Sequence, residues 1–187
     1  WRAANGIDDI LQTAPPHYDI ITRHFPSFMH LTDRHKNLVV IDRWKDVDIP
    51  GLSTHGIGHD ELIRHYMFQL EWLWSVALPN EDDMVTMIYD IDGVRYDQIT
   101  SAVFNLVKDR VLIGCENYPN RASLILAVNV PPFMVNFYNL ISTILRQETK
   151  SKVRILSKAD LQAGALTEII PPAHLIPEYG GTCRVPL

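Results

Sequence analysis

The order of apolar and polar positions along the chain predicts short buried strands that alternate with amphipathic helices. Apolar runs rich in β-branched residues are typical of buried strands and occur at 38–41, 84–89 and 124–128, and a shorter fourth strand is predicted at 152–156. Between them, apolar residues repeat with a helical period over 60–78 and 99–112. Alternation of this kind implies crossover connections, so we expect an α/β fold with a largely parallel sheet and flanking helices.

The first part of the chain, residues 1–33, has a different character. Pro15, Pro16 and Pro26 interrupt it, and proline both removes a backbone donor and restricts the residue before it. We therefore expect short helical pieces that wrap the edge of the domain. The 187 residues suit a single domain, 1–187, with a real core. The chain opens on Trp1 without a charged and then apolar leader, so we expect no signal peptide and a fragment of a longer protein.

One segment carries no charge over 24 positions, from Ala122 to Leu145. The helix predicted at 133–145 is apolar nearly all round, and its polar members are Asn136, Asn139, Ser142 and Thr143. Such a helix is normally buried in a core. Pro131 and Pro132 leave it shorter than the roughly 20 residues that span a bilayer. The other reading is a lid, one face toward an internal ligand cavity and the other able to touch lipid.

Composition and charge exclude several classes of protein. Hydrophobic residues make up 47% of the chain and charged residues 21%, which is typical of a globular domain. A net charge of −5 argues against a nucleic-acid partner, whose phosphates need neutralisation. Cys115 and Cys183 lie far apart, so we expect reduced thiols and a cytoplasmic location.

The sequence offers no catalytic constellation. The glycines at 56 and 58 lack the third glycine of a dinucleotide loop, and the histidines around them are poorly spaced for a metal. The acidic stretch at 90–93 has too few oxygen ligands for calcium and is predicted to be a turn. Cys115 has no evident histidine partner. We expect no enzyme activity, no metal and no cofactor.

Three stretches, taken in order, resemble the CRAL-TRIO family, the lipid-binding module of the fungal phosphatidylinositol/phosphatidylcholine transfer protein and of the tocopherol and retinaldehyde carriers. They are Tyr118-Pro119-Asn120-Arg121 with the strand and Asn129-Val130-Pro131 after it, Thr149-Lys150-Ser151-Lys152 running into Val153-Arg154-Ile155-Leu156, and Leu175-Ile176-Pro177-Glu178-Tyr179-Gly180-Gly181. The resemblance covers nearly the whole chain, without the family's helical N-terminal subdomain. It implies a floor of strands and a mobile gate helix, which falls on 133–145.

The resemblance also implies roles for individual residues. Family members that bind phosphatidylinositol use the threonine and lysine that correspond to Thr149 and Lys152, and charge-assisted donors suit a phosphate. Asn120 replaces the glutamate that helps in the family's phosphatidylinositol site. Of the residues that hold phosphatidylcholine in the family only Arg121 is kept, so we expect no choline-lipid binding of the familiar kind; the others correspond here to apolar side chains: Met29, Val40, Leu70, Val85 and Met87. A single-chain or sterol-like ligand therefore stays open beside phosphatidylinositol.

We interpret the chain as a monomeric, non-catalytic carrier or sensor of one amphipathic lipid that visits membrane surfaces from the cytoplasm. Its ligand would be a phospholipid or another hydrophobic small molecule. The predicted headgroup residues are Asn120, Arg121, Thr149 and Lys152, and the predicted pocket residues are Val40, Leu70, Val85, Met87, Tyr89, Phe133, Phe137 and Ile141. The alternative is an interaction module of a larger signalling or trafficking protein, with a closed pocket.

Overall fold

A five-stranded sheet forms the centre of the computed structural model, which describes residues 1–187. The strands are β1 (Ser27–Thr32), β2 (Leu38–Arg43), β3 (Val85–Asp90), β4 (Ala122–Val128) and β5 (Val153–Leu156), and they lie in that order across the sheet. β1 pairs antiparallel with β2, and all the other pairs are parallel. The predicted largely parallel α/β sheet is confirmed.

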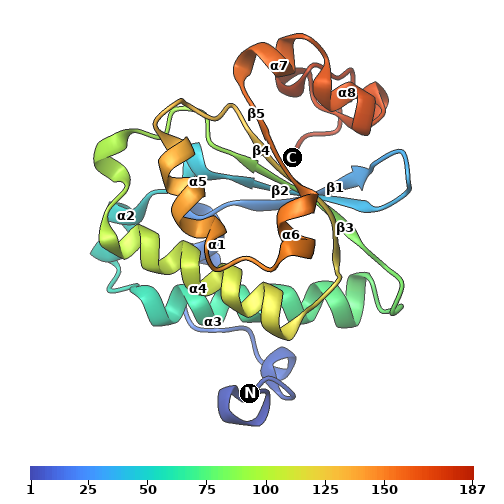
Figure 1. Ribbon diagram of the computed structural model, residues 1–187. Helices are drawn as coiled ribbons and strands as arrows, with labels where there is room; N and C mark the ends of the chain where they lie inside the picture. Colours follow the sequence, from blue (N-terminus) through green and yellow to red (C-terminus); the bar gives the residue numbers. More distant parts are fainter.

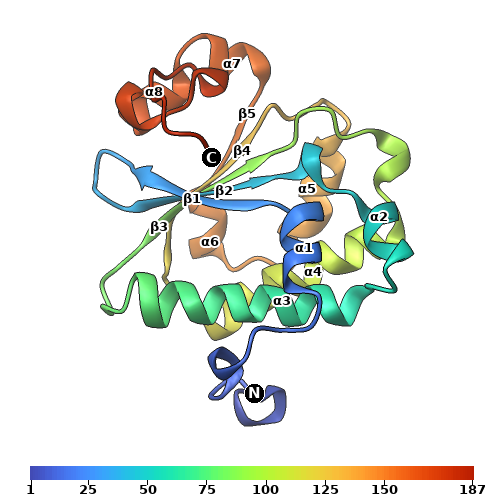
Figure 2. The same ribbon diagram turned by 180° about the vertical axis from the view of Figure 1, so that it is seen from behind.

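The order of the strands decides which face the helices cover. Right-handed crossovers between parallel strands that follow one another across a sheet put every connecting helix on the same face. The connections contain α2 (Ile49–Thr54), α3 (His59–Trp72), α4 (Ser101–Asn117), α5 (Met134–Ser142) and α6 (Gln147–Lys152). In Figures 1 and 2, α3, α4 and α6 lie below the sheet, together with α1 (Tyr18–His24), and α5 extends downward from the level of the strands.

Local signals in the sequence set the ends of these helices. The Thr100 hydroxyl accepts a hydrogen bond from the Val103 amide at 3.3 Å and caps the start of α4. Before α3, the Gly58 amide donates to the Glu61 carboxylate at 3.0 Å. The predicted helix 60–78 ends in a π-helical turn, Leu73–Ala77, that stops before Pro79.

The other face of the sheet is covered by the C-terminal part of the chain, which contains α7 (Lys158–Gln162) and α8 (Ala165–Ile169) and lies above the sheet in Figure 1. Here alternate residues of the strands, including Val39, Ile41 and Ile88, pack in a core with Leu166 and Ile170. This face is closed by side chains.

Two expectations need correction. Residues 27–32 form strand β1, although 1–33 was predicted to consist of short helical pieces; such pieces occur only at Ala3–Asn5, Ile10–Gln12 and Tyr18–His24. Pairing with β2 decides the outcome for 27–32, because strand formation depends on a partner that local sequence does not reveal. Lys152 ends helix α6 instead of beginning the last strand. No helix has the length and apolar character needed to cross a bilayer.

Candidate functional site

A cavity of about 1080 Å³ lies between the sheet and the crossover helices that cover one of its faces. Of its 53 lining residues 35 are hydrophobic, so the space suits a largely apolar ligand. Ligand sites typically measure about 300–1,000 Å³, so this cavity has room for a large molecule. The pocket predicted between the sheet and the 133–145 helix is therefore present.

Strand alternation builds the floor of the cavity. Successive side chains of a strand point to opposite faces, so residues in register on neighbouring strands share one face. One such row crosses all five strands and consists of Met29, Val40, Met87, Ile125 and Val153. The next row consists of Ser27, Asp42, Tyr89, Ala127 and Ile155. The first row is wholly apolar, whereas the second contains a carboxylate and a phenol.

Helix α5 forms a wall of the cavity and is apolar on both sides. Phe137 and Ile141 line the cavity, as predicted. On the outer side, Val135 and Leu140 are 45% and 54% exposed. The lid reading of this helix thus fits the geometry better than a fully buried core helix.

Phe133 is the one predicted pocket residue that does not line the cavity. It precedes α5 and packs edge-to-face on Tyr96, with ring centroids 5.9 Å apart. The helix starts one residue later than predicted, so the first position of the predicted range falls outside the wall. The other predicted pocket residues border the cavity: Val40, Leu70, Val85, Met87, Tyr89, Phe137 and Ile141.

All four predicted headgroup residues border the cavity. Thr149 and Lys152 are three positions apart on α6 and therefore share one side of that helix. The Thr149 hydroxyl lies 3.9 Å from the Cys115 sulfur, and burial raises the pKa of that thiol. Lys152 takes part in none of the ion pairs of the protein, so its ammonium group is available to a ligand.

Arg121 is already engaged by the protein. Its Nη1 donates to the carbonyl oxygens of Asn80 at 2.7 Å, Glu81 at 3.1 Å and Asp83 at 3.3 Å. Its guanidinium carbon lies 4.9 Å from the centre of the Trp74 ring. Arg121 thus fixes the loop before β3, and Asn120 beside it occupies the left-handed region at φ +61°. The structure of this loop therefore explains why Asn120 and Arg121 occur in the motif.

A polar group that the sequence analysis missed lies inside the cavity. Arg110 Nη2 donates to Asp42 Oδ2 at 2.8 Å, and the side chains are only 12% and 2% exposed. The guanidinium carbon of Arg110 lies 4.7 Å and 4.4 Å from the ring centres of Phe25 and Tyr66. The sequence of β2 could have revealed Asp42 as a cavity residue, because the two-residue period of a strand puts Asp42 on the same face as Val40.

Two tyrosines stand beside this ion pair. Tyr89 is in register with Asp42, and Tyr66 stacks on Arg110. Burial raises the pKa of Tyr66 to about 12, although Arg110 opposes the shift. Burial also raises the pKa of Tyr89. Both phenols are therefore uncharged near neutral pH and able to donate a hydrogen bond.

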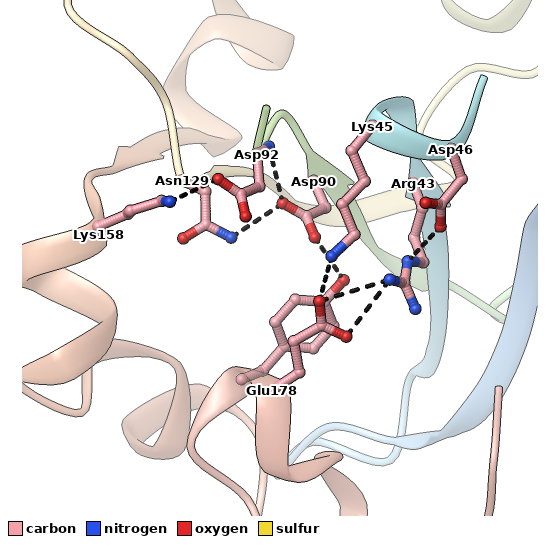
Figure 3. Close-up of polar contacts among 9 residues, drawn as sticks. Arg43, Lys45, Asp46, Asp90, Asp92, Asn129, Lys158 and Glu178 are labelled. Atoms are coloured by element: carbon pink, nitrogen blue, oxygen red, sulfur yellow. Dashed lines mark hydrogen bonds and ion pairs between the residues drawn. The ribbon is translucent and has the colours of Figure 1, made fainter. Parts of the chain in front are cut away.

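A second polar cluster lies where the strands end, away from the cavity (Figure 3). Asp90 accepts hydrogen bonds from the Tyr179 hydroxyl at 3.0 Å and from Asn129 Nδ2 at 2.9 Å. Glu178 pairs with Lys45 and with Arg43. Figure 3 shows these contacts joining the C-terminal segment to the ends of β2, β3 and β4. The Tyr-Gly-Gly stretch thus closes the far face of the sheet.

Comparison with known proteins agrees with this architecture. The Sec14 cytosolic factor of Schizosaccharomyces pombe is 26% identical over 196 residues, which cover 100% of this chain and 66% of that protein. The phosphatidylinositol/phosphatidylcholine transfer protein SFH9 of Arabidopsis thaliana is 26% identical over 98% of this chain and 33% of its own length. The chain thus spans less than two thirds of these relatives.

The fold is also similar to the crystal structure of Sfh5, with a TM-score of 0.70, 18% sequence identity, and coverage of 87% of this chain and 57% of that one. The profile of the CRAL/TRIO domain matches residues 22–181. This match covers most of the chain and includes both the cavity floor and the C-terminal segment. The chain belongs to the CRAL/TRIO domain family.

Proposed function

We propose that this domain binds one amphipathic lipid in its cavity and carries it between membrane surfaces without catalysing a reaction. The observation that carries the proposal is the large apolar cavity between the sheet and α5. A closed interaction module would have this space filled by side chains. The name of the Arabidopsis relative SFH9 supports the proposal, because it describes transfer of phosphatidylinositol and phosphatidylcholine.

The polar end of the lipid is proposed to lie at α6. Thr149 offers a hydroxyl, and Lys152 offers an ammonium group that no carboxylate of the protein neutralises. This pair suits a phosphate, because charge-assisted hydrogen bonds are stronger than neutral ones. The apolar row through Met29, Val40 and Met87 offers neither a donor to the phosphate nor an aromatic ring to the quaternary ammonium of a phosphatidylcholine headgroup, which favours phosphatidylinositol.

The outer face of α5 supports contact with a membrane. Val135 and Leu140 are exposed there, and a lid over an apolar ligand must tolerate lipid when it opens. We propose that the domain acts as a monomer in the cytoplasm and docks transiently on membranes through this helix.

The test is to purify the domain, identify the co-purified lipid by native mass spectrometry, and measure transfer of phosphatidylinositol and phosphatidylcholine between vesicles. We expect one lipid per chain and faster transfer of phosphatidylinositol. A domain that takes up no lipid from either vesicle would contradict the proposal.

A further inference from the structure

We infer that Asp42, Arg110, Tyr66 and Tyr89 form an inner polar subsite for an uncharged oxygen function, a hydroxyl or a carbonyl, on the buried end of the lipid. This inference rests on the proposed carrier function and adds a second point of recognition to it. All four residues line the cavity. Together these four residues form the inner subsite.

The hydroxyls of the inner subsite have unused hydrogen-bonding capacity. Tyr118 and Tyr179 donate their hydroxyls to the carboxylates of Glu71 and Asp90. Those of Tyr66 and Tyr89, in contrast, donate to no acceptor of the protein although both side chains line the cavity. Both hydroxyls open into the cavity, so an oxygen on a ligand can accept a hydrogen bond from either of them and gain affinity.

The backbone of α4 leaves room for one of these hydroxyls. Gly114 lies inside α4, where glycine is less favourable than alanine because it loses more backbone freedom on folding. A Cβ at this position would lie 3.2 Å from the Tyr66 hydroxyl oxygen, closer than ordinary van der Waals contact. Glycine here thus lets the phenol keep its place in the cavity.

The charge of the inner subsite selects the ligand. Arg110 is neutralised by Asp42, whose carboxylate is only 2.8 Å away, so the pair has no net charge. A second carboxylate or phosphate at this place would be repelled by Asp42 in a poorly solvated environment, which disfavours the charged form. The remaining donors of Arg110 and the two phenols suit a neutral oxygen.

The inner subsite is separate from the proposed headgroup site. Arg110 precedes Cys115 by five residues on α4, a rise of about 7.5 Å, and the Cys115 sulfur is a further 3.9 Å from the Thr149 hydroxyl. A lipid whose hydroxyl points inward therefore reaches other donors than Lys152 and Thr149. A lipid with a polar group at each end can reach both sets of donors.

The experiment compares three ligands that share one chain and differ in the terminal group: hexadecanol, hexadecanoate and hexadecane. Trp44 and Trp74 line the cavity, so their fluorescence reports binding to the full domain. We expect the wild type to bind hexadecanol more tightly than hexadecane. Tyr66→Phe and Tyr89→Phe remove only a hydroxyl, and each is expected to weaken hexadecanol binding about 2- to 12-fold, the range of one neutral hydrogen bond.

Matched controls separate the possible explanations. Tyr138→Phe removes a hydroxyl from the α5 wall of the same cavity and is expected to leave hexadecanol binding unchanged. Hexadecane binding should be equal in all these variants. Binding of hexadecanoate should be weakened by Lys152→Ala and unchanged in Tyr66→Phe and Tyr89→Phe, because the carboxylate of this ligand is attracted to the Lys152 ammonium group on α6.

Each outcome decides a different point. If hexadecanol and hexadecane bind equally, or if only Thr149→Ala weakens hexadecanol binding, the inner subsite is refuted and the carrier function stands. If hexadecanoate loses affinity in Tyr89→Phe, the argument from neutral charge is refuted. If none of the three ligands binds, the proposed carrier function fails together with the inner subsite.

Discussion

The hydroxyl of Tyr179 donates a hydrogen bond to the carboxylate of Asp90 across 3.0 Å, although 89 positions separate the two residues in the sequence. Tyr179 is 1% exposed and belongs to the core that joins the C-terminal segment to the sheet. This contact ties the end of β3 to the segment that covers the face opposite the cavity.

Tyr179→Phe is expected to destabilise the domain by about 1–3 kcal/mol, because it leaves one oxygen of the buried Asp90 without its phenol partner. Urea unfolding followed by circular dichroism measures the change. Tyr96→Phe is the control, since Tyr96 is 77% exposed and should unfold like the wild type. An unchanged midpoint for Tyr179→Phe would show that the hydrogen bond contributes nothing to stability.

Asp42→Leu is expected to destabilise the domain by about 3–5 kcal/mol, because it leaves the charge of Arg110 buried without a partner. The double variant Asp42→Leu with Arg110→Met removes both charges and should recover most of that loss. Urea unfolding of the two single variants and the double variant gives the coupling between them. Additive losses in the double variant would contradict the role of the ion pair.

Lys152→Ala is expected to weaken phosphatidylinositol binding by roughly 10- to 150-fold, the value of a hydrogen bond to a charged group. Thr149→Ala should cost less, about 2- to 12-fold. Lys150→Ala is the matched control, because Lys150 belongs to the same helix but does not line the cavity. Vesicle transfer assays measure all three, and equal transfer by the wild type and Lys152→Ala would refute the headgroup assignment.

Arginine substitutions on β3 distinguish side chains that face the open cavity from side chains that are packed in the core. Met87 is half-buried and lines the cavity, so Met87→Arg should leave a folded domain that no longer takes up lipid. Val85 is only 2% exposed and packs with Val40 and Leu73, so Val85→Arg should unfold the domain through an unpaired buried charge. Circular dichroism and lipid uptake report the two results. Unfolding of Met87→Arg would contradict the open cavity.

His65 makes stability depend on pH. Burial, with the Arg110 charge nearby, lowers the pKa of this side chain from 6.5 to about 4. The unfolded chain therefore binds a proton at a pH where the folded chain does not, and stability rises with pH between about 4 and 6.5. The full effect is on the order of 3 kcal/mol at 1.36 kcal/mol per pKa unit.

Urea unfolding at pH 4.5 and pH 7 measures this dependence. His65→Gln should flatten it, whereas His55→Gln, at an exposed position, should keep the slope of the wild type. A slope that His65→Gln leaves unchanged would assign the pH dependence to another group.

The sequence by itself determined strands β2 to β5, the largely parallel character of the sheet and the apolar character of α5, because apolar runs and helical periods are local properties of the chain. It also predicted Val40, Met87 and Tyr89 as pocket residues, and all three border the cavity. The family motifs located Thr149 and Lys152 at the cavity.

Only the tertiary structure decided the rest. Strand β1 forms because β2 offers a partner, and no local signal marked it. Arg121 borders the cavity as predicted, and its Nη1 also donates to carbonyl groups of the loop before β3, which the linear sequence does not place beside it. The Asp42–Arg110 pair joins residues 68 positions apart. Whether a buried charge finds its partner depends on how the helices pack on the sheet, and that packing is a property of the folded chain alone.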